Sequence, residues 1–382
     1  MTIGILKEPA RETKVSLVAE AVATLTKQGI TVWVENGAGD NAFCGNADYE
    51  KAGAQVKEKN DVLVAADIIL SIHQPLQSAM ADLKSKIIIG VFQPLYNAGL
   101  MQQWANQGIT TFSLDMLPRT TRAQAMDVLS SQGNINGYKA ALTAANLYAR
   151  YFPMFMTAAG SIPPAKVLIL GAGVAGLLAI ATSRRLGAVV EVFDTRAAVK
   201  EEVMSLGAKF VEVEGAADAS KAGGYAVEQS AEFIQRQKAK IAESIAKADI
   251  VITTAQIPGK KAPVLITEEM ISAMRKGSVI IDIAAATGGN TPVTKNNETI
   301  SYHGVTIVGN SNLAATMPYD ASRMYGKNVL NFLKLIINKE GQINLNWEDD
   351  LVKGCCITHG GEITNEKVKT LVLAKTDGFD EV

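Results

Sequence analysis

The sequence predicts an α/β protein with two doubly wound domains that are joined by long helices, with a cleft between them. Short apolar runs alternate with longer segments of helical pattern over residues 1–115, and again over residues 165–310. This alternation is typical of parallel sheets covered by helices. A glycine-rich turn follows the first apolar run of the second region, as in sheets that bind a nucleotide at their edge. We therefore expect two Rossmann-like domains.

The first domain is expected to hold no dinucleotide of its own. Its strands are expected at residues 2–6, 31–35, 67–72, 86–92 and 109–113. Amphipathic segments at residues 15–29 and 97–108 are expected to form helices between the strands, and a glycine ends the first of these helices. No glycine-rich turn follows the strand at residues 2–6, so the phosphate-binding feature of a dinucleotide site is missing there.

The segment at residues 116–152 is expected to connect the two domains. After Pro118 it has the pattern of a long helix, with Thr120 or Thr121 as its N-cap. The stretch from Gly133 to Gly137 is a candidate break in this helix, because glycine weakens helix interiors.

The chain is expected to return to the first domain through a helix at residues 319–338. Residues 355–364 are expected to form a hairpin with a glycine turn. The first domain therefore comprises residues 1–130 and 320–382, and the second, dinucleotide-binding domain comprises residues 131–319.

The second domain has the strand count of a Rossmann fold. Its strands are expected at residues 167–170, 189–193, 209–213, 250–254, 278–283 and 305–309. The connection at residues 214–246 is long and contains a glycine pair and a tyrosine. Loops of this length are often functional. The alternative is that this connection is simply a variable surface loop without a role. We expect a mobile excursion followed by a polar helix.

The glycine-rich turn carries the chemistry of a dinucleotide site. Gly171, Gly173 and Gly176 have G-x-G-x-x-G spacing between an apolar run and a helical run. In this spacing the first glycine allows a tight turn, the second lets the backbone approach a pyrophosphate, and the third lets the helix pack on the strand. Asp194 lies at the expected distance, roughly 20 residues on, to accept the ribose hydroxyls. The alternative is a tight turn with a purely structural role.

Composition and charge exclude several classes of partner. The chain has 382 residues, 48% hydrophobic and 20% charged, with a formal net charge of −1. This balance is typical of an ordinary globular protein and gives no electrostatic reason to bind nucleic acid or an anionic membrane. No uninterrupted apolar segment approaches the roughly 18 residues of a membrane span, and the start of the chain resembles neither a secretory signal nor a transit peptide.

The cysteines predict a reducing compartment. Cys44, Cys355 and Cys356 are an odd, partly adjacent set, which is no disulfide framework. No spacing of cysteines and histidines is typical of zinc, so we expect no metal site.

Five segments together carry a resemblance to a known family. They are residues 116–138, 156–177, 223–226, 253–267 and 277–290. In these segments the chain resembles the NAD(H)-binding domain I of proton-translocating NAD(P) transhydrogenase, on its alpha subunit. The membrane helices of a full-length alpha subunit are absent from the chain, so it resembles the separate alpha-1 form or a domain excised from a longer chain.

The resemblance implies site residues in both domains. Those expected around the nicotinamide and its ribose, at the interdomain cleft, are Arg119, Gln124, Asp127 and Ser130. Those expected to hold the pyrophosphate and the adenosine ribose are Gly173, Val174, Asp194, Thr195 and Arg196, and Gly171 and Gly176 are expected to shape the same cofactor-binding turn. Gly224 and Tyr225 are expected on a mobile loop that closes over the nucleotide, and Gln237 and Gln256 near it. The family usually has leucine where this chain has Gln256. Arg119 and Asp127 have a structural alternative, a solvated ion pair at a helix start.

The resemblance also implies partners. NAD(H) is the expected cofactor of this chain, and NADP(H) is expected on a partner subunit that receives the hydride. Proton translocation is expected in membrane-spanning subunits. The chain is expected to form a homodimer on the cytoplasmic face of the membrane, and to contact the membrane only through its partners.

Alanine dehydrogenase is the related family and the main alternative function. Where its pattern has an arginine, a lysine, a histidine and a late aspartate, this chain has Lys14, His73, Gln93 and Ala286. Forming an imine from a keto acid needs an acid–base group and a carboxylate anchor. His73 is a candidate base, but a single histidine at a strand end is more often structural. The sequence therefore favours transhydrogenation over an amino-acid dehydrogenase, and a non-catalytic NAD sensor is a third possibility.

Overall fold

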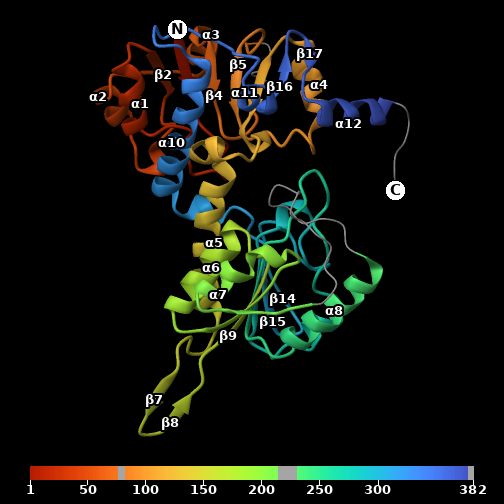
Figure 1. Ribbon diagram of the computed structural model, residues 1–382. Coiled ribbons are helices and arrows are strands. Elements are labelled where there is room, and N and C mark those ends of the chain that lie inside the picture. Colours follow the sequence, from red (N-terminus) through yellow and green to blue (C-terminus); the bar gives the residue numbers. More distant parts are fainter. Residues whose placement is uncertain (76–81, 214–229, 377–382) are drawn as a thin grey trace. The chain divides into compact units, whose positions relative to one another are not determined.

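The computed structural model describes residues 1–75, 82–213 and 230–376, and the chain divides into two compact units (Figure 1). Unit 1 comprises Met1–Gln132 and Met317–Val382, and unit 2 comprises Gly133–Thr316. Helix α5 (Val128–Leu147) begins in unit 1 and continues in unit 2.

Unit 1 contains an eight-stranded sheet of order β17-β16-β6-β5-β4-β1-β2-β3. The strands are β1 (Thr2–Ile5), β2 (Thr31–Glu35), β3 (Gln55–Lys57), β4 (Ile68–Leu70), β5 (Ile87–Gly90), β6 (Thr110–Ser113), β16 (Cys356–His359) and β17 (Glu362–Ile363). The strands β1 to β6 pair in parallel, whereas β16 and β17 run antiparallel. The sheet is thus parallel except at one edge.

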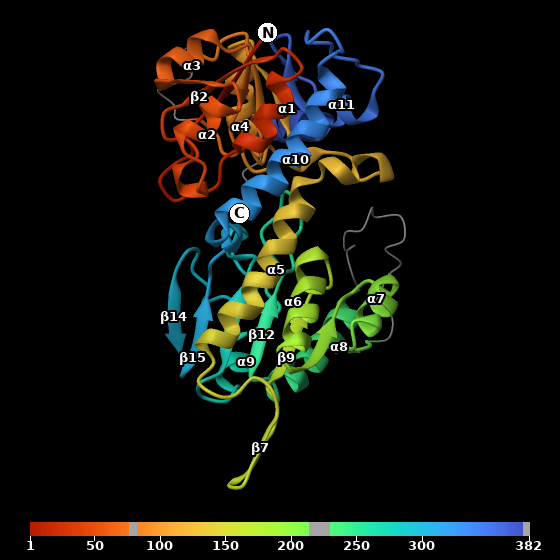
Figure 2. The same ribbon diagram turned by 90° about the vertical axis from the view of Figure 1, so that its left-hand side faces the viewer.

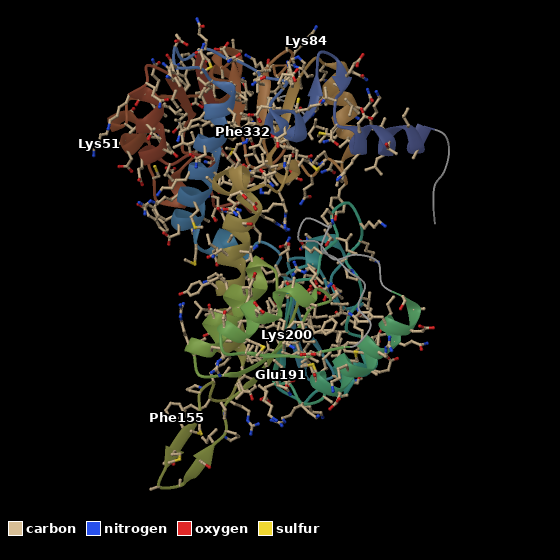
Figure 3. All side chains as sticks on the ribbon, viewed as in Figure 1. Lys51, Lys84, Phe155, Glu191, Lys200 and Phe332 are labelled. Carbon is tan, nitrogen blue, oxygen red and sulfur yellow. The ribbon has the colours of Figure 1, made fainter. Side chains whose placement is uncertain are left out.

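Helices cover both faces of this sheet. They are α1 (Ala19–Thr26), α2 (Asn46–Lys51), α3 (Lys59–Ala65), α4 (Ala98–Asn106), α10 (Pro318–Ile336), α11 (Asp350–Cys355) and α12 (Glu366–Thr376), with 3-10 turns η1 (Asp40–Ala42), η3 (Leu114–Met116) and η4 (Thr121–Met126). On one face α10 inserts Phe332, labelled in Figure 3, against Phe112 of β6. On the other face Trp104 of α4 packs edge-on against Phe92. Burial of these apolar faces is the main force that holds the unit together.

Unit 2 contains a seven-stranded sheet of order β11-β10-β9-β12-β13-β15-β14. The strands are β9 (Lys166–Leu170), β10 (Val189–Phe193), β11 (Lys209–Phe210), β12 (Ile250–Thr253), β13 (Val279–Asp282), β14 (Thr299–Tyr302) and β15 (Val305–Val308). All pairings are parallel except that of β14 with β15. From β9 the chain first builds one side of the sheet and then crosses to β12 on the other, so the strand order reverses between β9 and β12.

Helices α5, α6 (Val174–Arg185) and α7 (Lys200–Ser205) pack on one face of the second sheet, and α8 (Ala231–Ile245) and α9 (Glu268–Ser272) pack on the other. Two further 3-10 turns flank the strands, η5 (Ala197–Val199) and η6 (Ala285–Thr287), and η7 (Leu313–Thr316) ends the unit. Figure 2 shows α5 and α6 side by side on their face. A hairpin of β7 (Phe155–Thr157) and β8 (Gly160–Ile162) extends from this unit with every residue of both strands exposed.

The structure confirms the α/β class with parallel, Rossmann-like sheets, and it corrects details. The expected break at Gly133 to Gly137 is wrong, because α5 is continuous there. A Cβ atom at Gly137 would lie 1.9 Å from the carbonyl oxygen of Ala175 in α6, so this glycine allows two helices to approach closely. The expected capping of the long helix by Thr120 or Thr121 is also wrong, because those residues start η4 and α5 begins at Val128.

Several short elements were not expected from the sequence. These are β3, β14 and the β7–β8 hairpin. The expected hairpin near the C-terminus is present as β16 and β17, with Gly360 and Gly361 at φ of 60° and 88° in its turn. The expected polar helix is present as α8, whereas most of the excursion before it, residues 214–229, lies outside the described residues.

Candidate dinucleotide-binding site

The turn after β9 has the geometry that its glycine spacing predicts. Gly171 has φ of 102°, and a Cβ atom there would lie 2.5 Å from Oγ1 of Thr254. A Cβ atom at Gly176 would lie 1.9 Å from the carbonyl oxygen of Gly171. A side chain at Gly176 would therefore force the helix away from the turn, and one at Gly171 would clash with Thr254 and strain the backbone. The first and third glycines are structural requirements of this turn.

Gly173 differs, because open space surrounds it. A Cβ atom there would meet no atom within 4 Å, and Gly173 is the N-cap of α6 without a side-chain cap. The first N–H groups of a helix have no partner within the helix, and they favour an anion. Val174, the first residue of α6, is 40% exposed. The start of α6 beside Gly173 and Val174 is therefore a candidate place for an anionic group.

Asp194 lies directly after β10, and its side chain is only 6% exposed. Its carboxylate accepts hydrogen bonds from the backbone N–H of Ala172 at 2.7 Å and from that of Arg196 at 2.8 Å. The Arg196 guanidinium donates to both Asp194 oxygens, at 2.9 and 2.7 Å. This hydrogen bonding raises the pKa of Arg196. The carboxylate is thereby fixed beside the glycine turn, with Thr195 between the two charged residues.

The connection after β12 lies at the edge where the strand order reverses. Thr254 contacts the glycine turn, because its Oγ1 donates to the carbonyl oxygen of Gly171 at 3.1 Å. Gln256 follows on the surface, and its amide donates to the carbonyl oxygen of Ile283 at 3.4 Å. In open α/β sheets ligands bind at such a switch point, outside the carboxyl ends of the strands.

Gln237 lies on the buried face of α8, with Phe233 and Ile241. The predicted loop residues Gly224 and Tyr225 lie outside the described residues.

The remaining predicted residues lie around the start of α5 in unit 1. Asp127 is the residue before α5, and its carboxylate accepts from the backbone N–H of Ser130 at 2.9 Å and from its hydroxyl at 2.6 Å. Asp127 therefore caps this helix. Gln124 is exposed on η4, and Arg119 is exposed just before η4.

The segment that carries Gln124 is anchored from two sides. Asn328 and Asn331 of α10 both donate to the carbonyl oxygen of Ala125, at 2.9 and 3.1 Å. Arg122 donates to both oxygens of Asp349, and this hydrogen bonding holds the pKa of Asp349 at about 2. The backbone of this segment is thus held in place within unit 1 by α10 on one side and by Asp349 on the other.

Unit 1 also contains a buried acidic cluster that the sequence did not predict. The Glu12 carboxylate lies 3.2 Å from the Lys14 ammonium and 2.8 Å from Nε2 of His73. Burial raises the pKa of Glu12, but the hydrogen bond to His73 and the charge of Lys14 outweigh burial and hold the pKa at about 2. Glu8 accepts from the backbone N–H groups of Ile72 and His73, yet burial raises its pKa to about 7.

Two members of this cluster, Lys14 and His73, are the residues expected from the resemblance where alanine dehydrogenases have an arginine and a lysine. Lys14 and His73 both contact Glu12, so a protein carboxylate already occupies the space between these two side chains and compensates the charge of Lys14. Gln93 starts a turn with φ of 49°, and Ala286 lies in η6. The run of charged residues at 7–14 was the available sequence signal for the cluster formed by Glu8 and Glu12.

Two features are absent from the described ranges, residues 1–75, 82–213 and 230–376. Within them no three side chains of His, Cys, Asp or Glu gather as a metal site. No helix within these ranges combines the length and the apolar character needed to cross a membrane.

The fold defines a Rossmann-type protein, and within the described residues unit 2 contains a glycine turn with the geometry of a candidate nucleotide site. Two family models match the chain: "Alanine dehydrogenase/PNT, N-terminal domain" over residues 4–136 and "Alanine dehydrogenase/PNT, C-terminal domain" over residues 140–366. The chain belongs to this alanine dehydrogenase/PNT family, which confirms the predicted resemblance.

Within this family, the transhydrogenase relatives are more similar in sequence to this chain than the alanine dehydrogenase relatives are. The chain is 42% identical to a protein of Rickettsia prowazekii that is named as the first portion of NAD(P) transhydrogenase subunit alpha, over 99% of this chain and 100% of that relative. A solved structure of transhydrogenase from Sinorhizobium meliloti matches with a TM-score of 0.86 at 43% identity, over 95% of this chain and 100% of the other. Alanine dehydrogenase of Staphylococcus epidermidis is 26% identical over 96% of each chain.

Proposed function

We propose that this chain is the NAD(H)-binding component of an NAD(P) transhydrogenase, which passes hydride from NADH to NADP⁺ on a separate subunit. The observation that carries the proposal is 42% identity to a transhydrogenase subunit over nearly the whole chain, against 26% to an alanine dehydrogenase. Both relatives cover more than nine-tenths of the chain, so the difference does not come from a shared half alone.

The geometry of unit 2 supports NAD(H) as the cofactor. Gly173 and the first turn of α6 would hold the pyrophosphate, and Asp194 would accept the hydroxyls of the adenosine ribose. A buried carboxylate repels a 2′-phosphate. Arg196 is engaged by Asp194 on both of its oxygens, so its charge is compensated rather than offered to that phosphate. These residues favour NAD(H) over NADP(H).

Bound NADH supplies the hydride, and the protein orients the ring that carries it. Transfer between two nicotinamides requires contact of the rings and exclusion of water, but no proton donor on a side chain. Gln124 and Arg119 offer donors for a carboxamide or a ribose hydroxyl. Asp127 and Ser130 form the cap of α5, which fixes the backbone beside Gln124.

The acidic cluster of unit 1 supports hydride transfer without amino-acid chemistry. A keto acid needs an uncompensated cation to bind its carboxylate. Glu12 lies against both Lys14 and His73, so a substrate carboxylate would meet the fixed negative charge of Glu12 at this point. The same repulsion opposes binding of pyruvate.

The partners follow from the same proposal. NADP(H) is held by another subunit, and proton translocation takes place in membrane-spanning subunits. The chain acts as a homodimer that associates with the membrane, on its cytoplasmic face, through those subunits.

A single-turnover assay tests the function. The purified chain is mixed with NADH, an NADP⁺ analogue with a distinct reduced absorbance, and the separately purified NADP(H)-binding subunit. Rapid analogue reduction is expected only when both proteins are present. A parallel assay with pyruvate, ammonia and NADH should show no oxidation of NADH. Ordinary enzymatic turnover of pyruvate, or no analogue reduction, would overturn the proposal.

A further inference from the structure

Two segments flank the switch point of unit 2, the place where open α/β sheets bind ligands. We call them the two walls of the site: the glycine turn after β9 is the first wall, and the connection after β12, starting at Thr254 and Ala255, is the second wall. The strands lie in register at this edge, since Thr253 pairs with Leu170 on one side and with Asp282 on the other. The position of the second wall relative to the glycine turn therefore depends on what holds this connection in place.

Asn290 holds the connection through three hydrogen bonds. Its side chain is completely buried. Its amide oxygen accepts from the backbone N–H of Ala255 at 3.2 Å, and its amide nitrogen donates to the carbonyl oxygens of Ala255 at 2.9 Å and of Pro263 at 2.8 Å. One side chain thus fixes both the start and the end of the segment from Ala255 to Pro263.

Asp282 in turn holds Asn290. Asp282 is completely buried at the end of β13. One carboxylate oxygen accepts from the hydroxyl of Thr253 at 3.0 Å and from the backbone N–H of Ala284 at 3.0 Å. The other accepts from the backbone N–H of Asn290 and from the hydroxyl of Thr294, both at 2.7 Å. A carboxylate with four such donors is a rigid anchor.

The backbone before Asn290 is shaped for this anchor. Gly289 has φ of 78°, and a Cβ atom there would lie 2.8 Å from the Asp282 carboxylate and 2.7 Å from the side chain of Thr294. Glycine at this position therefore lets the chain turn around the buried carboxylate and present the Asn290 amide to the connection.

We propose that Asn290, anchored by Asp282, is a positioning residue that sets the second wall of the proposed dinucleotide site against the glycine turn. This inference rests on the proposed NAD(H)-binding function. Asn290 acts through the backbone of Ala255 and Pro263 and touches no nucleotide itself. The wall it fixes includes Thr254, whose hydroxyl bonds to the carbonyl oxygen of Gly171, so its displacement also loosens the phosphate-binding turn.

The test measures NADH affinity by fluorescence titration of the full chain. Asn290→Ala removes all three bonds, and the dissociation constant is expected to rise at least about tenfold, which corresponds to about 1.4 kcal/mol. Asn290→Asp keeps the size of the side chain, so it serves if the alanine variant does not fold. An ionised carboxylate cannot donate to the two carbonyl oxygens, whereas a protonated one can donate to one. NADH affinity of Asn290→Asp is therefore expected to recover partly as the pH falls from about 8 to about 6, unlike that of the wild type.

A matched control separates positioning from a general loss of stability. Thr267→Ala removes the N-cap of α9, where the Thr267 hydroxyl accepts from the backbone N–H of Met270 at 3.3 Å. It should lower the melting temperature of the protein and leave NADH affinity unchanged. Wild-type affinity in a folded Asn290 variant, or equal weakening by Thr267→Ala, would overturn the positioning role while the proposed function stands. A wild-type chain that does not bind NADH would overturn both.

Discussion

Replacing Gly137 with alanine is expected to destabilise the protein, although alanine is the better helix former. Within a helix interior alanine is favoured over glycine by about 1 kcal/mol. At Gly137, however, the new Cβ atom would lie 1.9 Å from the carbonyl oxygen of Ala175, a backbone atom that no rotamer change can move. Helices α5 and α6 must separate by about 1 Å, and overpacking of this kind costs about 1–3 kcal/mol. The steric cost exceeds the helical gain.

Gly133 provides the control on the same helix. A Cβ atom there would lie 3.9 Å from Val174 and from Ala175, which is ordinary contact. Gly133→Ala should therefore keep most of the helical gain and raise the melting temperature, by roughly 2 °C or less per kcal/mol, since the shift per kcal/mol falls as the chain lengthens. Gly137→Ala should lower it.

Thermal unfolding followed by circular dichroism distinguishes the two variants. Because Ala175 lies in the first turn of α6, Gly137→Ala should also weaken NADH binding, whereas Gly133→Ala should not. A Gly137→Ala variant that melts at or above the wild-type temperature would refute the reasoning from close helix packing.

Three further predictions concern charged and polar groups. Asp194→Asn should weaken NADH binding and reduce the preference over NADPH, as measured by calorimetric titration; an unchanged preference would contradict its role. Because burial raises the pKa of Glu8 from 4.5 to about 7, Glu8 loses its proton at lower pH in the unfolded chain than in the folded one. The unfolding free energy should therefore fall as pH rises across that interval, by up to about 3 kcal/mol, and Glu8→Gln should remove this decrease in urea titrations. Gln124→Asn should slow single-turnover hydride transfer by up to about a hundredfold with little change in NADH affinity, and normal transfer would exclude a positioning role for Gln124.

The sequence predicted those parts of the fold that depend on local patterns. Gly171 and Gly176 could be interpreted from spacing alone, because the turn they allow joins adjacent elements. Gly137 is also a glycine, but the sequence predicted a helix break there. The actual requirement for glycine at this position is the close contact with Ala175 of α6, which lies far along the chain and leaves no local pattern. Short strands such as β3 and β14 have few residues and mixed polarity, so their pairing is decided by the sheet rather than by the segment.

The residues of the candidate site also fall into two groups: those that a local pattern predicts and those that meet only in the folded chain. Asp194 was predicted because its distance from the glycine turn is fixed by one strand–helix–strand unit. Asn290 and Asp282 were not, because their roles arise only when β12 and β13 lie side by side. Glu12 was missed for a related reason, since its partner His73 is far away in sequence and meets it only in the folded unit.

The three cysteines allow the opening of one unit to be followed separately from the other. Cys44, Cys355 and Cys356 all lie in unit 1 and are buried, and burial raises the pKa of each thiol. A thiol reagent therefore reacts slowly with the folded chain and marks only those moments when unit 1 opens. Unit 2, the unit with the proposed nucleotide site, contains no cysteine. The reagent therefore cannot modify unit 2, and the rate of its reaction reports on unit 1 alone. Protection of the thiols on adding NADH would thus report directly that binding in one unit restrains the other.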